Sequence, residues 1–171
     1  MTILDLSTAI EMGLASDKPH QAPQIIYRSH ADNAETVAKA YGVTKDELPY
    51  GIGWANETIT LASHSGCHMD APWHYFPTMN NGEPSRTIDQ VPLEYCFSDG
   101  VHLDFSQWDP RKIIHADDIR RVLDQMEYQL KPLDIVLLES GAAPHFGQPD
   151  YTSYGAGVSE EATVWLMEQG I

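Results

Sequence analysis

Residues 134–140, with the sequence DIVLLES, constrain the fold more than any other segment of this chain. Four successive apolar residues between polar ends are typical of a β-strand that is covered on both faces. Further strands are predicted where short apolar runs recur, at residues 3–7, 57–63 and 100–105. Helical patterns lie between these runs, and this alternation favours an α/β fold.

Residues 117–130 carry the clearest helical pattern, because apolar side chains recur at the spacing of one buried stripe. Asp117 at the start of this stretch suits the positive end of a helix dipole. A second helix is predicted to begin at Ser159, a good N-cap residue, and to end near Gly170. Residues 33–48 are predicted to form one or two short helices.

The size and charge of the chain limit its organisation and its partners. A length of 171 residues indicates one domain. The formal net charge is −15, from 10 Lys and Arg against 25 Asp and Glu. Binding to nucleic acid or to anionic lipid depends on cationic groups that neutralise phosphates, so neither is predicted as a partner. A small-molecule substrate is expected instead.

Cysteine use and hydropathy indicate a reducing, aqueous setting. The two cysteines, Cys67 and Cys96, do not make a disulfide framework. No apolar run approaches the roughly 20 residues that a membrane-spanning helix needs. The N-terminal segment carries Asp5 and Glu11, where a secretory signal would need a cationic start. We therefore predict a cytoplasmic location.

Two loops and the chain end complete the outline. Residues 78–86 are rich in Asn, Gly and Pro, and residues 142–157 have little regular pattern. Loops of the second length are often functional, so substrate specificity is expected to reside in these segments. A further strand would be expected beyond Gly170. The chain is therefore interpreted as a single domain, residues 1–171, either complete or lacking its C-terminal part.

Residues 64–74, HSGCHMDAPWH, hold three of the eight histidines of the chain. The spacing from His64 to His68 would suit one face of a helix, but Gly66 and Pro72 oppose a helix here. In an extended segment, alternate side chains project to the same side, which would gather the histidines and Asp70. Gly66 would then leave room for an ion between His64 and His68. Cys67 and Met69 would project to the opposite side, towards the core.

Two imidazoles and one carboxylate are a typical three-ligand set for zinc or a neighbouring divalent metal. The segment therefore predicts a metal site. The remaining histidines are interpreted as surface or hydrogen-bonded structural residues: His20, His30, His102, His115 and His145.

The eleven-residue string resembles the signature of the metal-dependent cyclase-like hydrolases, His-x-Gly-Thr-His-x-Asp-x-Pro-x-His. That family includes kynurenine formamidase and isatin hydrolase. Residues 5–7, 134–141 and 157–166 look similar to other family segments in the same order. The resemblance therefore covers the whole chain.

The resemblance implies that His64, His68 and Asp70 are ligands of a divalent metal, zinc or manganese, and that His74 is the catalytic histidine. It implies a metal-dependent hydrolase that acts, through metal-activated water, on the amide or lactone carbonyl of a small cyclic or aryl substrate. It also implies a homodimer or homotetramer, and an α/β fold with a mixed sheet or barrel-like β core and surrounding helices.

This sequence departs from the family pattern in two ways. Cys67 stands where the family usually has Thr, and we interpret it as a core substitution. The further His and Glu ligands of two-metal family members lie in a region beyond Ile171, which puts a second metal in doubt.

Two interpretations remain beside the hydrolase, and the role of the flanking aromatic residues is also open. A non-haem iron oxygenase also uses two His and one carboxylate. A truncated or degenerate domain could bind metal without catalysis. The aromatic residues that flank the histidine segment could line a pocket, although aromatic residues next to a strand are more often core: Trp54, Trp73, Tyr75 and Phe76.

Overall fold

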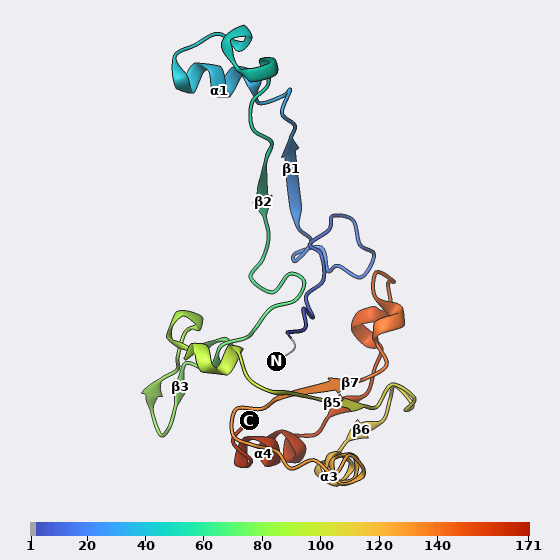
Figure 1. The fold of residues 1–171 in the computed structure, drawn as a ribbon. Coiled ribbons are helices and arrows are strands. Elements are labelled where there is room, and N and C mark those ends of the chain that lie inside the picture. The colour runs from blue at the N-terminus through green and yellow to red at the C-terminus, as the bar shows by residue number, and fades with distance from the viewer. Residues whose placement is uncertain (1–2) are drawn as a thin grey trace. The chain divides into compact units, whose positions relative to one another are not determined.

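The computed structural model describes residues 3–171 and confirms the α/β class. Its helices and strands alternate along the chain, as Figure 1 shows. The described strands pair into four two-stranded sheets and form no closed barrel. The chain divides into two compact units, Met1–His68 and Met69–Ile171. No helix among the described residues is long and apolar enough to cross a membrane.

The first unit is built on an antiparallel ribbon of β1 (Gln24–Arg28) and β2 (Asn56–Thr60). Between these strands lie α1 (Ala34–Tyr41) and two 3-10 helices, η1 (Lys45–Glu47) and η2 (Pro49–Gly51). The prediction of short helices over residues 33–48 is therefore confirmed. A small core forms here from the buried residues Ala34, Val37 and Ala38.

Gly42 ends α1 because it adopts a left-handed backbone conformation, with φ +68°. Its N–H donates back to carbonyl groups of the last helical turn. Such a conformation is open to glycine and costly for other residues.

The second unit is centred on β5 (Gly100–Asp104) and β7 (Ile135–Glu139), which pair in parallel. The helices α3 (Ala116–Gln125) and α4 (Glu160–Glu168) pack with this sheet into one hydrophobic core. Its most buried members are Leu103, Phe105, Ile114, Ala116, Ile119 and Ala162. The predicted strands at 57–63, 100–105 and 134–140 thus correspond to β2, β5 and β7.

Shorter elements connect these parts of the second unit. They are α2 (Pro72–Tyr75), the antiparallel pair β3 (Thr78–Met79) and β4 (Glu83–Pro84), the parallel pair β6 (Ile113–Ile114) and β8 (Gly157–Val158), and the 3-10 helices η3 (Ile88–Gln90), η4 (Leu93–Cys96), η5 (Ala143–His145) and η6 (Tyr151–Ser153).

The prediction of a strand at residues 3–7 is wrong, because these residues lie outside regular secondary structure. The Asp5 carboxylate accepts hydrogen bonds from the backbone N–H of Ser7, at 2.9 Å, and from its hydroxyl. A local turn of this kind competes with strand pairing for the same backbone groups.

The helix predicted over residues 117–130 is shorter than expected and ends at Gln125. Glu127 adopts a left-handed conformation, with φ +53°, which stops the helix before Leu130. The prediction for α4 is confirmed at its start, because the Ser159 hydroxyl accepts a hydrogen bond from the N–H of Ala162 at 3.1 Å. Gly170, with φ +89°, follows the end of this helix.

Candidate metal centre

The histidine segment leaves β2 through a turn and ends in the short helix α2. Gly66 lies in this turn with φ +64°, so the backbone bends where an extended chain had been predicted. The prediction of uninterrupted alternation over residues 64–74 is therefore wrong, although the argument against one continuous helix is confirmed. Among the described residues, a Cβ atom at Gly66 would meet only Ile10, at 3.9 Å, so its backbone conformation is the stronger reason for a glycine.

Three of the predicted site residues gather within this one continuous segment. His64, Asp70 and His74 each offer a ligand atom, and these atoms all lie within 4.8 Å of one another. His64 and Asp70 are half-buried, and His74 is exposed on α2. The grouping could hold a divalent cation, since imidazole nitrogen and carboxylate oxygen are both common ligands.

His68 lies beside this group and contacts it through His64. The two imidazole rings meet edge to face, with centroids 4.9 Å apart and planes at 80°. The Nδ1 atom of His68 lies 2.8 Å from the carbonyl oxygen of Gly66. A hydrogen bond from Nδ1 to this carbonyl leaves Nε2 as the nitrogen through which His68 would coordinate a metal.

Asp70 is joined to the helical turn that follows it. The hydroxyl of Tyr75 donates a hydrogen bond to Asp70 Oδ2 at 2.9 Å. This hydrogen bond, followed by burial and the negative charge of Asp70, raises the pKa of Tyr75 above its ordinary value. The Tyr75 ring also meets the His74 ring edge to face at 5.0 Å. The motif spacing gave no indication of this contact, because it depends on the turn that begins at Pro72.

Cys67 is exposed, so the interpretation of this residue as a core substitution is wrong. Its sulfur lies 3.4 Å from the Thr8 hydroxyl and near the carbonyl oxygen of Leu6. Met69, which was also expected to face the core, is exposed as well. Both errors have one cause. The bend at Gly66 interrupts the alternation of side chains from which Cys67 and Met69 were predicted to face the core.

The aromatic residues around the segment are exposed rather than part of the core: Trp54, Trp73, Tyr75 and Phe76. Their interpretation as core residues is therefore wrong.

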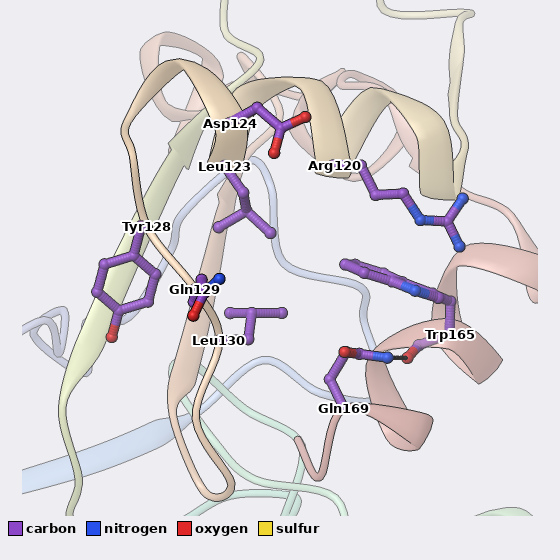
Figure 2. Close-up of a pocket in the computed structure, with 8 residues that line it drawn as sticks. All are labelled: Arg120, Leu123, Asp124, Tyr128, Gln129, Leu130, Trp165 and Gln169. Atoms are coloured by element: carbon purple, nitrogen blue, oxygen red, sulfur yellow. Dashed lines mark hydrogen bonds between the residues drawn. The ribbon is translucent and has the colours of Figure 1, made fainter.

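A hollow of about 360 Å³ lies elsewhere in the second unit, between α3 and α4 (Figure 2). The Arg120 guanidinium lies over the Trp165 ring there, 4.7 Å from its centroid. None of the residues of the histidine segment lines this hollow.

Three of the other histidines form short polar contacts. His102 Nε2 lies 2.8 Å from Glu139, and His145 Nδ1 lies 2.9 Å from Asp150. His115 Nδ1 lies 3.6 Å from Glu161. The interpretation of these three as hydrogen-bonded or surface residues is confirmed.

The long segment 142–157 is compact rather than irregular. It contains η5 and η6, and the N–H of Ala156 donates to the carbonyl of Ser140 at 3.1 Å, which brings its two ends together. His145 stacks on Tyr154 inside it, with ring centroids 3.6 Å apart. Compact loops that are packed by their own side chains are frequently functional.

The sequence matches the model of the Cyclase family, described as "Putative cyclase", over residues 4–171. The chain belongs to this family, and the resemblance inferred from the histidine segment is confirmed. A search among curated proteins finds no match.

Solved structures share the fold. Isatin hydrolase A from Ralstonia solanacearum has a TM-score of 0.70 and 18% identity, covering 98% of this chain and 63% of that chain. An isatin hydrolase bound to the product analogue thioisatinate has a TM-score of 0.68 and 16% identity, with the same coverage. A structure described as a novel cyclase has a TM-score of 0.68 and 19% identity, covering 96% and 61%. The chain thus spans about three-fifths of the length of these proteins.

Proposed function

We propose that this chain is a metal-dependent hydrolase that acts on the amide, lactam or lactone carbonyl of a small cyclic or aryl substrate. The observation that carries the proposal is the gathering of His64, Asp70 and His74, with ligand atoms within 4.8 Å of one another. Membership of the Cyclase family and the fold shared with isatin hydrolases support it.

The side chains present fit a divalent metal. His64, His68 and Asp70, the set that the family resemblance implies, would hold zinc or manganese through two imidazoles and one carboxylate. The ligand atoms that lie within 4.8 Å of one another belong to His64, Asp70 and His74, and His68 lies beside them. The contact between His68 Nδ1 and the Gly66 carbonyl supports this assignment. Metal-binding histidines usually donate their second ring N–H to a carbonyl or a carboxylate, which fixes the ring orientation.

A divalent metal in this position would supply a Lewis acid that polarises a carbonyl and lowers the pKa of water towards neutrality. The chain itself supplies the proton carrier. His74 lies next to the proposed ligands, and histidine is the side chain that most often serves as a general acid or base. We assign to His74 the proton transfers to and from the reacting groups.

Substitution of the two histidines separates metal binding from proton transfer. We expect His68→Ala to lose both bound metal and turnover, because one of three ligands is removed. We expect His74→Ala to keep nearly all its metal and to lose turnover by about 10²–10⁴-fold, the usual contribution of a general acid or base. Metal content by elemental analysis and steady-state rates are the measurements.

The same pair of variants tests a second ligand set. His64, Asp70 and His74 could themselves hold the metal, with His68 in a supporting role. In that case His74→Ala would lose its metal, and His68→Ala would retain part of it. Normal turnover in metal-loaded His74→Ala would exclude both roles for His74.

The reaction is tested with three probes: an aryl formamide, an isatin-type lactam and a dienelactone. We expect at least one to be hydrolysed, with activity lost to a chelator and restored by Zn²⁺ or Mn²⁺. Metal binding without turnover of any probe would favour a non-catalytic metal-binding domain. Turnover that needs Fe(II) and oxygen would favour an oxygenase.

We further propose that the protein is cytoplasmic and forms a homodimer or homotetramer, with neither nucleic acid nor membrane as a partner. The net charge of −15 supports the last point. The β1–β2 ribbon supports self-association, because it exposes Ile26, Tyr27 and Ile59 and a two-stranded ribbon alone is marginally stable.

A further inference from the structure

We propose that Tyr75 is a positioning residue of the metal centre, acting through Asp70; this inference rests on the proposed function. The Tyr75 hydroxyl donates to Asp70 Oδ2 at 2.9 Å. Groups that hydrogen-bond to a ligand carboxylate fix its orientation and tune its affinity for metal. Tyr75 is therefore placed to control the one anionic ligand of the proposed set.

The backbone between the two residues produces this contact. Ala71 is extended and is followed by the short helix α2, which begins at Pro72. The N–H of Phe76 donates to the Pro72 carbonyl at 3.2 Å, and the N–H of Trp73 donates to the Arg86 carbonyl at 3.1 Å. These bonds hold the turn that brings Tyr75, five residues along the chain, back to Asp70.

The tyrosine ring also contacts the proposed proton carrier. Its centroid lies 5.0 Å from that of the His74 ring, in an edge-to-face arrangement with planes at 79°. A phenylalanine at position 75 would keep this ring contact and lose only the hydroxyl. The variant Tyr75→Phe therefore isolates the hydrogen bond to Asp70.

The hydroxyl has a defined effect on the carboxylate. A hydrogen bond to Oδ2 restricts rotation of the Asp70 side chain about its last torsion, which would otherwise be broad. Without the hydrogen bond, the carboxylate samples more orientations before metal binds. Fixing it in one orientation on binding then costs more conformational entropy, which weakens metal affinity. Since Tyr75 itself is largely exposed, at 72%, the loss of metal affinity in Tyr75→Phe is expected near the lower end of the range usual for such supporting residues.

Zn²⁺ affinity is the direct test, measured on the full chain by competition with a chromophoric chelator. We expect Tyr75→Phe to bind Zn²⁺ about tenfold more weakly than the unmodified protein. The matched control is Tyr95→Phe, which removes a half-exposed tyrosine hydroxyl that makes no hydrogen bond within residues 3–171. We expect the control to bind Zn²⁺ within about twofold of the unmodified protein.

A double-substitution cycle with Asp70→Asn shows whether the effect passes through Asp70. We expect Tyr75→Phe to cost little further affinity once the carboxylate is gone. An equal loss in both backgrounds, or equal Zn²⁺ affinity of Tyr75→Phe and the unmodified protein, would overturn the positioning role. Failure of the unmodified protein to bind Zn²⁺ would instead contradict the proposed function, so the two failures are distinct.

Discussion

Asp134 shows, at the scale of one residue, how the second unit accommodates a buried charge. Only 1% of its side chain is exposed. Its carboxylate accepts hydrogen bonds from the Tyr128 hydroxyl at 2.8 Å and from the Lys131 backbone N–H at 2.9 Å. The Lys131 ammonium lies 3.2 Å from the other oxygen. A buried carboxylate is tolerated because it is paired and hydrogen-bonded in this way.

These contacts decide the direction of the pKa shift. Burial alone would raise the pKa of Asp134, but the hydrogen bonds from Lys131 and Tyr128 and the charge of Lys131 together lower it. A lowered pKa in the folded state stabilises the protein above the unfolded value, near pH 4. This contribution is lost as the pH falls through the folded pKa.

We expect Asp134→Asn to lower the free energy of unfolding at pH 7 by about 1–3 kcal/mol, because buried partners lose a charged acceptor. As the pH falls below about 4, the free energy of unfolding of Asp134→Asn should also decrease less than that of the unmodified protein. Urea denaturation followed by circular dichroism at several pH values measures both effects. The control Asp117→Asn changes an exposed ion pair with Arg120 and should have little effect. Equal effects of the two substitutions would contradict the role given to Asp134.

At the residue scale, the residue types of the histidine segment indicated a metal site, but their arrangement in space was only partly predictable. Alternation predicted that the three histidines of the segment and Asp70 would gather. The structure groups His64, Asp70 and His74, and it leaves His68 beside this group, in contact with His64. The metal assignment of His64, His68 and Asp70 and the catalytic role of His74 stay predictions. The hydrogen bond from Tyr75 was missed because it depends on a turn, and turn geometry is not encoded by alternation.

At the scale of elements, prediction succeeded where one buried face dominates. The apolar run of β7 and the Ser159 cap of α4 are strong local signals. Prediction failed at residues 3–7, where a side-chain hydrogen bond to Ser7 competes with pairing. It also failed at the end of α3, because nothing in the spacing of apolar residues marks the left-handed conformation of Glu127.

Gly141, just after β7, is an element boundary where both the backbone conformation and a close backbone contact require glycine. Its φ is +84°, and a Cβ atom there would lie 2.7 Å from the carbonyl oxygen of Ser106. Both the conformation and the contact involve backbone, so no side-chain rotation can relieve them. A side chain at this position must therefore displace one of two chain segments.

We expect Gly141→Ala to lower the free energy of unfolding by about 2–5 kcal/mol, since strain and overpacking add. Gly82→Ala is the matched control, because Gly82 also has positive φ, +111°, but no atom of residues 3–171 lies within 4 Å of an added Cβ. The difference between the two variants in thermal or urea unfolding measures the steric contact alone. If Gly82→Ala is equally destabilising, the close approach to Ser106 is not the cause.

At the scale of the whole molecule, the sequence predicted the α/β class and the family through one motif and the pattern of apolar runs. It did not predict the division into Met1–His68 and Met69–Ile171. The single domain indicated by length stays a prediction, and the division into these units depends on contacts between distant segments that local patterns do not encode. The parallel pairing of β5 with β7 has the same long-range origin, since 30 residues separate the strands.

The compact loop between β7 and β8 has an evolutionary consequence. Its ends are held together by the hydrogen bond from Ala156 to Ser140, while His145 and Tyr154 pack within it. Because the anchor belongs to the ends of β7 and β8, which lie in two different sheets, the interior of the loop can be exchanged, lengthened or shortened while these strand ends stay together. Proteins that descend from one ancestor with this loop can therefore vary its interior widely and keep the strands on either side of it unchanged.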